Sequence, residues 1–160
     1  MGSEMCIRDR NNIVDAIGYK ERIYPVGRLD KDSTGLILMT NNGALMDAIL
    51  RGRNQHEKEY VVTLDRPMKK EICEAMEQGV PILDTMTKPC VITNRSGNTF
   101  HIILTQGLNR QIRRMCEYFG YRVRTLKRIR IMNIWLEDLP EGAWRELTAD
   151  ETAELKRQCK

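Results

Sequence analysis

Residues 27–40 read GRLDKDSTGLILMT, a charged turn that runs directly into an apolar segment. The continuous apolar run over residues 35–40 is short enough to predict a buried β-strand. Four of the five residues from Arg28 to Asp32 carry a charge, whereas a turn needs only a few polar groups. A solvated surface turn is the plainest interpretation of these charges, and a metal loop or a reaction centre are the alternatives.

Two functional interpretations of the charged turn find little support elsewhere in the sequence. A calcium loop that begins at Asp30 and continues through Asp32 requires a bidentate glutamate at its last position, where the sequence has Asn41. A glycosidase would use Asp30 and Asp32 as its two carboxylates, but no other residue indicates a sugar-binding cleft. The motifs typical of serine hydrolases, zinc proteases and P-loop proteins are absent from the sequence.

Around this turn, apolar periodicity and turn residues predict alternating strands and helices. We expect strands at residues 22–27, 35–40 and 58–65, a β-hairpin over residues 88–106, and a strand with one basic face within residues 121–136. Pro25 lacks a backbone donor, so the strand at 22–27 is expected at an edge. Helices are expected over residues 11–18, 41–52, 69–79 and 109–120, and within 144–158. This order predicts an α+β fold with a mixed, mostly antiparallel sheet flanked by helices.

Two helices have specific signals at their ends. The helix over residues 109–120 has Asn109 as its expected N-cap and Gly120 as its C-terminal stop. Its apolar face carries Ile112, Met115, Cys116 and Phe119, and its polar face carries Arg110, Arg113, Arg114 and Glu117. In the last helix, Thr148 and Glu151 have the spacing of a capping box.

The charge is distributed unevenly along the chain. The net charge is only +4, but residues 110–130 contain eight Lys or Arg residues against one acidic residue, Glu117. This concentration favours a surface that binds a polyanion, and a solvated basic face is the alternative. The same two interpretations apply to Lys127, Arg128 and Arg130 on the strand with the basic face.

Cysteine usage and hydropathy exclude several protein classes. The five cysteines are scattered without a CxxC pair, which argues against a disulfide framework or a zinc site and favours the reducing cytoplasm. No apolar run approaches the length of a membrane-spanning helix. The first ten residues, MGSEMCIRDR, lack both periodicity and the apolar core of a signal peptide. We expect residues 1–10 to be a leader or a sequence scar outside the fold, which leaves residues 11–157 as the globular domain.

Three segments together resemble a known family. They are VGRLDKDSTGLILMTNNG (residues 26–43), KEYVVTL (residues 58–64) and GLNRQIRRM (residues 107–115). In this order and spacing they are similar to the RNA pseudouridine synthases of the RsuA/RluB/RluE/RluF branch, and most of all to the RluF type. The resemblance runs from residue 11 to residue 157. It implies the pseudouridine synthase catalytic fold with two interlocked α/β subdomains. It also implies isomerisation of uridine to pseudouridine in RNA without metal or cofactor, above all in 23S ribosomal RNA, with transfer RNA as a possible second substrate.

The resemblance also implies roles for individual residues. Asp30 is the expected nucleophile, acting at the base or the ribose of the target nucleotide. Tyr60 stacks on the uracil and assists proton transfer, and Arg113 pairs with the Asp30 carboxylate and fixes its direction. Arg28 helps to extrude the target base, and Ile112 forms an apolar pocket wall. Further RNA contacts are expected from Leu29, Lys31, Arg110 and Gln111. Each of these residues also has an ordinary structural interpretation, as core, strand aromatic or surface charge.

The sequence departs from the family pattern at its beginning. The small S4-type RNA-binding domain and the opening strand with a KPxG-like motif are not found, so we expect a truncated catalytic domain, monomeric and cytoplasmic. A non-catalytic RNA-binding module with the same fold is the main alternative, and an enzyme that hydrolyses glycosidic bonds is another. The presence of Asp30, Tyr60 and Arg113 together favours the synthase.

Overall fold

The computed structural model describes residues 4–7, 22–51 and 55–159, and its strands form three sheets. The three-stranded sheet has the order β1 (Glu4–Ile7), β4 (Ile37–Thr40), β2 (Tyr24–Val26). The six-stranded sheet has the order β11 (Ile134–Trp135), β10 (Val123–Ile131), β5 (Lys58–Leu64), β9 (Thr99–Leu104), β8 (Val91–Ser96), and β3 (Thr34–Gly35) joins it beside β10. A small hairpin pairs β6 (Pro81–Ile82) with β7 (Thr85–Met86). The described helices are α2 (Gly43–Arg51), α3 (Lys70–Gln78), α4 (Gln111–Tyr118) and α5 (Ala149–Gln158).

These elements confirm an α+β fold with mostly antiparallel strands. Every strand pair in the described ranges is antiparallel except β3 with β10, which is parallel. The strands and helices expected from residue 22 onward are present, most of them shorter than expected, and Pro25 lies on the edge strand β2. No helix in the described part of the chain is both long and apolar enough to cross a membrane.

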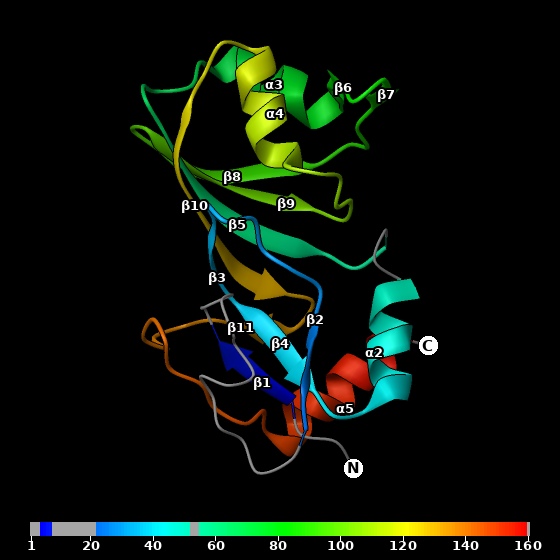
Figure 1. Ribbon diagram of the computed structural model, residues 1–160. Coiled ribbons are helices and arrows are strands. Elements are labelled where there is room, and N and C mark those ends of the chain that lie inside the picture. The colour runs from blue at the N-terminus through cyan, green and yellow to red at the C-terminus, as the bar shows by residue number, and fades with distance from the viewer. Residues whose placement is uncertain (1–3, 8–21, 52–54, 160) are drawn as a thin grey trace.

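Two hydrophobic cores divide the molecule into two lobes (Figure 1). In the first lobe, α3 and α4 cover β5, β9 and β8, and Phe100 lies in the core between them. The second lobe combines the three-stranded sheet with α2 and α5 around Leu38. Strand β10 belongs to both lobes, because its Leu126 lies in the first core and its Ile131 in the second. The expectation of two interlocked subdomains is therefore confirmed.

The first residues of the chain differ from expectation. Residues 4–7 were expected to lie outside the fold, but they form β1, antiparallel to β4, with Glu4 opposite Thr40 and Ile7 opposite Ile37. Side-chain periodicity did not reveal this strand, because pairing along an open strand edge uses backbone groups that every such residue carries. The helix expected over residues 11–18 lies outside the described residues.

The last helix, α5, begins with the expected capping box. The Glu151 amide donates to Thr148 Oγ1 at 3.1 Å, and the Thr148 amide donates to Glu151 Oε1 at 2.9 Å. Arg145 also binds both Glu151 carboxylate oxygens at 2.8 Å. The hydrogen bond from Arg145 is the main cause that lowers the pKa of Glu151 to about 2. This carboxylate therefore fixes the start of α5 and ties it to the preceding loop.

Replacing Glu151 by glutamine is expected to reduce stability at neutral pH by about 1–2 kcal/mol, because the amide keeps the shape but loses the charged partner of Arg145. The ordinary pKa of 4.5 is lowered on folding, so the charge stabilises the protein fully above pH 4.5 and progressively less as the pH falls towards about 2. Urea unfolding at pH 7 and pH 3 measures the difference. A difference between wild type and Glu151→Gln that stays equal at both pH values would contradict this account.

Candidate active site

A cavity of about 510 Å³ lies between the two lobes. Its walls come from the segment between β2 and β3, from α2, from β5 and β10, and from the connection between β9 and α4. Seven of the nine predicted site residues line it, namely Arg28, Leu29, Asp30, Tyr60, Arg110, Gln111 and Ile112. The fold thus brings the three sequence segments of the predicted site to one place.

Asp30 is half-buried in the segment between β2 and β3. Gly27 directly follows β2 and has a φ of 84°, a conformation that favours glycine. The Asp30 carbonyl accepts a hydrogen bond from the Ser33 amide at 3.0 Å, which closes a turn directly after the carboxylate. Among the described residues, no hydrogen bond or ion pair engages the Asp30 carboxylate itself. Within this part of the chain, the Asp30 carboxylate on the cavity wall is left available to a ligand.

An aromatic ring and aliphatic side chains form part of the same cavity. Tyr60 on β5 is half-buried, while Ile112 on α4 and Leu126 on β10 are buried members of the first core. Side chains alternate along β5, so the face that carries Val62 into the core carries Tyr60 to the cavity. A flat ring beside aliphatic groups and a carboxylate suits a nucleobase that stacks on the tyrosine.

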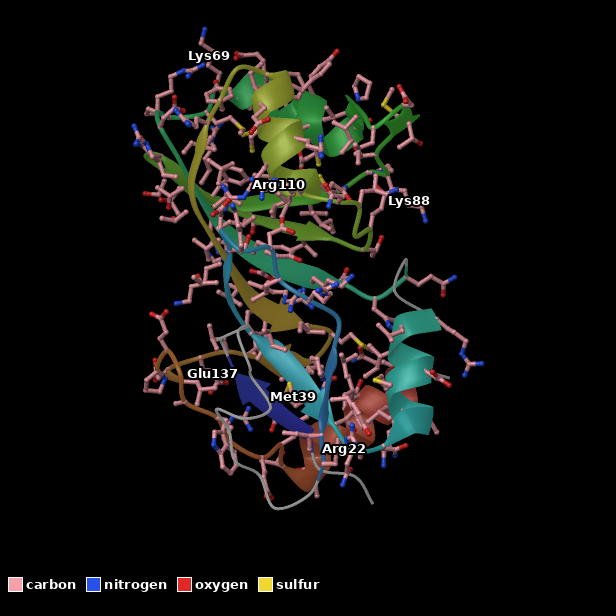
Figure 2. All side chains as sticks on the ribbon, viewed as in Figure 1. Arg22, Met39, Lys69, Lys88, Arg110 and Glu137 are labelled. Atoms are coloured by element: carbon pink, nitrogen blue, oxygen red, sulfur yellow. The ribbon has the colours of Figure 1, made fainter. Side chains whose placement is uncertain are left out.

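The cavity lining is strongly basic. It contains four cationic side chains, Arg28, Lys58, Arg110 and Arg128, but a single carboxylate, that of Asp30. Arg110 lies where the two lobes meet (Figure 2), and its Nη1 atom is 3.5 Å from Asp32 Oδ2. This balance of charge favours an anionic ligand such as a nucleic-acid strand.

Arg113 differs from its predicted place. It was expected to pair with the Asp30 carboxylate, but in the described residues no ion pair joins the two, and Arg113 does not line the cavity. Arg113 as a whole is 8% exposed, and its guanidinium donates from Nη2 to the backbone carbonyl of Asp32 at 2.8 Å. The physical reason is the turn after Asp30, which presents a carbonyl to α4. The Arg113 side chain therefore contacts the backbone of the Asp30 segment and not the Asp30 carboxylate.

Gln111 and Lys31, two of the predicted RNA contacts, lie in different surroundings. Gln111 is buried, its Oε1 accepts from the Leu108 amide at 3.0 Å, and its Nε2 donates to Gln106 Oε1 at 3.2 Å. Its side chain therefore holds the loop that precedes α4. Lys31 is exposed and lies outside the cavity lining.

The start of α4 also corrects a prediction. Asn109 was expected to cap the helix, but the N-cap residue is Arg110, with a left-handed φ of 50°. Both the carbonyl and the side-chain oxygen of Asn109 accept hydrogen bonds from Arg114, at 2.9 and 3.0 Å. Arg114 therefore occupies the acceptors that a cap would use. A non-glycine residue in this backbone region is unfavourable and is found most often at functional sites.

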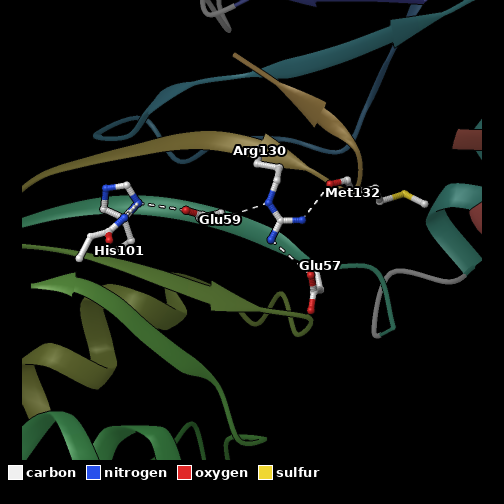
Figure 3. A network of polar contacts seen from close by, with 6 residues as sticks. Glu57, Glu59, His101, Arg130 and Met132 are labelled. Carbon is white, nitrogen blue, oxygen red and sulfur yellow. Dashed lines mark hydrogen bonds and ion pairs between the residues drawn. The ribbon is translucent and has the colours of Figure 1, made fainter. Parts of the chain in front are cut away.

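The basic residues of β10 do not form a solvated or RNA-facing stripe. Arg130 donates to Glu59 Oε1 at 3.1 Å, to Glu57 Oε1 at 3.3 Å and to the Met132 carbonyl at 2.8 Å (Figure 3). Arg128 is 5% exposed and binds backbone carbonyls in the Asp30 segment. Alternation along the strand predicted a basic face, but the tertiary structure buries Arg128 and engages Arg130 with carboxylates.

Sequence reasoning missed several residues that line the cavity, among them His56 and Lys58. The two-residue period of a strand, counted back from Tyr60, could have found both. Burial is the main cause that lowers the pKa of His56, the charge of Lys58 lowers it further, and a hydrogen bond with the Ile49 backbone opposes this shift. The imidazole is therefore uncharged at neutral pH.

The described residues offer no set of metal ligands. Nowhere in this part of the chain do three His, Cys, Asp or Glu side chains gather where they could hold an ion. Cys90 and Cys116 are buried beside the helices of the first lobe, and burial raises the pKa of each thiol to about 12. Both thiols are therefore protonated at neutral pH and poor ligands.

Comparison with known proteins agrees with this geometry. Residues 6–118 match the family model for RNA pseudouridylate synthase. The dual-specificity RNA pseudouridine synthase RluF of Escherichia coli (strain K12) is 54% identical over 147 residues, which cover 92% of this chain and 51% of that protein. The ribosomal large subunit pseudouridine synthase B of Bacillus subtilis (strain 168) is 35% identical over 142 residues, which cover 85% of this chain and 58% of that protein. These relatives confirm the resemblance that the three segments indicated.

A solved structure shares the fold closely. The crystal structure of a pseudouridylate synthase aligns with a TM-score of 0.89 at 28% sequence identity, over 97% of this chain and 74% of that chain. The chain spans about half the length of the RluF proteins that it matches.

Proposed function

Because the chain belongs to the RNA pseudouridylate synthase family, we propose that it converts uridine to pseudouridine in RNA at the cavity that contains Asp30. The observation that carries this proposal is the Asp30 carboxylate, which has no partner among the described residues and shares the cavity with Tyr60 and four cationic side chains. A carboxylate nucleophile, a stacking ring and a basic lining are the groups that this reaction needs.

The proposed substrate class is structured RNA, with ribosomal RNA first and transfer RNA second. The basic lining supports an RNA ligand, and the names of the relatives specify RNA and the large ribosomal subunit. We further propose that a monomer is sufficient, because the cavity is lined by residues of one chain. Four described cysteines are free, which fits the reducing cytoplasm as the place of action.

The reaction exchanges one bond of the nucleotide for another. The bond between uracil N1 and ribose C1′ breaks, and a bond between C5 and C1′ forms. Asp30 acts as a nucleophile on the base or the ribose, and its covalent bond to the nucleotide forms and breaks within the cycle. C5 then loses its proton and N1 gains one, so that the product has the same composition as the substrate. An enclosed pocket holds the detached uracil while it turns.

The other residues act around this step. Tyr60 stacks on the uracil, and its hydroxyl takes part in the transfer of the C5 proton. Ile112 forms the apolar wall, and Arg28 helps to extrude the target nucleotide from its stack. Arg113 is a positioning residue in this proposal, since it holds the Asp32 carbonyl two residues beyond Asp30. Leu29, Lys31 and Arg110 contact the RNA around the target nucleotide.

The proposed function predicts that tritium is released from RNA labelled at C5 of uridine, because the C5 proton is lost in every turnover. Ribosomal RNA fragments and transfer RNA transcribed with this label are incubated with the protein, and tritium in the water is counted. Time-dependent release by the wild-type chain supports the synthase. Saturable RNA binding without release would instead indicate the RNA-binding module, and release of free uracil would indicate glycosidic hydrolysis.

Replacing Tyr60 by phenylalanine is expected to lower turnover about 10²–10⁴-fold, because it keeps the ring but removes the proton-transferring hydroxyl. RNA affinity should change little, since the stacking surface remains. Single-turnover tritium release measures the first effect and fluorescence anisotropy with labelled RNA the second. Unchanged turnover would show that Tyr60 serves only as a stacking platform.

A further inference from the structure

One guanidinium closes the segment that carries Asp30. Arg128 donates from Nε to the Leu36 carbonyl at 2.9 Å and from Nη1 to the Arg28 carbonyl at 3.4 Å. These two carbonyls lie at opposite ends of the segment 28–36, which contains Asp30. The side chain of Arg128 thus bridges the start and the end of one loop.

The backbone of Arg128 already fixes one end of this loop without its side chain. The Leu36 amide donates to the Arg128 carbonyl at 2.9 Å, and Gly35 pairs with Arg128 where β3 runs parallel to β10. The start of the loop has no such ladder, because β2 ends at Val26 and pairs with β4. The guanidinium reaches the Arg28 carbonyl at this end.

Asp30 lies midway between two carbonyls that buried arginines hold. The Arg28 carbonyl, two residues before it, accepts from Arg128, and the Asp32 carbonyl, two residues after it, accepts from Arg113. The turn between them is closed by the bond from the Ser33 amide to the Asp30 carbonyl. The backbone of Asp30 is therefore held on both sides, while its carboxylate has no partner among the residues that the structure describes.

The charge of Arg128 is used differently from that of the nearby Arg130, which is partly buried. Arg130 lies between the carboxylates of Glu57 and Glu59 (Figure 3). Arg128 forms no ion pair in the described residues, and its Nη2 atom is buried without a hydrogen-bond partner. A buried cation that meets only neutral carbonyls is unfavourable for stability. The presence of Arg128 is therefore better explained by the position in which it holds the loop 28–36 than by any stability that it adds.

We propose that Arg128 is a positioning residue for the isomerisation. Its side chain closes the loop 28–36 and thereby sets the position of the Asp30 carboxylate relative to the nucleotide. This proposal rests on the function proposed above. Lysine cannot replace arginine in this role, because a single ammonium group lacks the planar fork that reaches two carbonyls at once.

The test compares Arg128→Lys with Arg130→Lys, which is a matched change of a partly buried arginine on the same strand but outside the cavity. Tritium release is measured in single turnover with protein in excess over RNA, and the plateau rate at saturating protein is recorded. Partial unfolding shifts the protein concentration that saturates the reaction but leaves the plateau rate unchanged. We expect Arg128→Lys to lower the plateau about 10²-fold, as a small displacement of a reacting group does, with RNA affinity nearly unchanged. Arg130→Lys should lower the melting temperature and keep the plateau.

Hydrogen exchange provides a second measurement that does not depend on turnover. The Ser33 amide should exchange faster in Arg128→Lys than in wild type, and at the wild-type rate in Arg130→Lys. Equal exchange in all three proteins, or a plateau within about threefold of wild type in Arg128→Lys, would overturn the positioning role. Loss of the folded state in both Arg128→Lys and Arg128→Gln would overturn it in favour of a purely stabilising role. Absence of tritium release from the wild type itself would refute the proposed function, and hydrogen exchange would still decide whether Arg128 closes the loop.

Discussion

Replacing Asp30 by asparagine is expected to reduce the single-turnover rate of isomerisation by at least about 10⁴-fold, as the loss of a nucleophile does in other enzymes. The amide has the shape of the carboxylate but neither its charge nor its nucleophilicity. No internal hydrogen bond or ion pair of the described residues depends on this carboxylate, so the melting temperature should stay close to that of wild type. RNA affinity should stay the same or rise slightly, because a negative charge facing the RNA is removed.

Asp32 offers a matched control for this change. Its carboxylate is half-exposed, and its contact with Arg110 is long at 3.5 Å. Its backbone carbonyl, which Arg113 holds, is unaffected by a side-chain substitution. Asp32→Asn should therefore keep the rate within about tenfold, since an exposed ion pair contributes little. Equal losses in Asp30→Asn and Asp32→Asn would indicate a general effect of loop charge, and substantial turnover in Asp30→Asn would exclude the nucleophile assignment.

Replacing Gly35 by alanine is expected to cause the largest loss of stability, more than about 4 kcal/mol. Gly35 has a φ of 119°, and a β-carbon there would lie 2.2 Å from the Arg128 carbonyl oxygen and 2.5 Å from its amide nitrogen. Both contacts are with backbone, so no side chain can rotate away. Strands β3 and β10 would have to separate, although they join the Asp30 segment to the six-stranded sheet.

Gly43 provides the control for this prediction. It is the first residue of α2, and a β-carbon there would meet no atom within 4 Å. Gly43→Ala should leave stability unchanged or raise it slightly, because alanine favours a helix more than glycine does. Urea unfolding followed by circular dichroism compares the two variants. A loss in Gly35→Ala no greater than that in Gly43→Ala would show that β3 and β10 are not in close contact.

Local patterns in the sequence determined most of the secondary structure. The apolar run of β4, the hairpin of β8 and β9 and the capping box of Thr148 and Glu151 were all found, because their signals lie within a few residues of each other. The errors also have local causes. The short strand β1 uses backbone pairing that needs no side-chain pattern, and Asn109 was expected to cap a helix that begins instead at Arg110.

The three motif segments also determined where the candidate site lies. Their residues line one cavity, and seven of the nine predicted site residues belong to its wall, namely Arg28, Leu29, Asp30, Tyr60, Arg110, Gln111 and Ile112. Helix and strand periodicity did not show which of these side chains are used for contacts within the protein. Gln111 holds a loop, and Arg130 is engaged by two glutamates on its own side of the sheet.

Only the tertiary structure decided how the Asp30 segment is held. Arg113 binds a carbonyl 81 residues away in the sequence, and Arg128 binds carbonyls 92 and 100 residues away. If the partner of such an arginine were a charged side chain, the sequence would suggest the pair, as it suggested Asp30 for Arg113. A backbone carbonyl is present at every residue, so an arginine that binds one leaves no complementary residue in the sequence by which its partner could be identified.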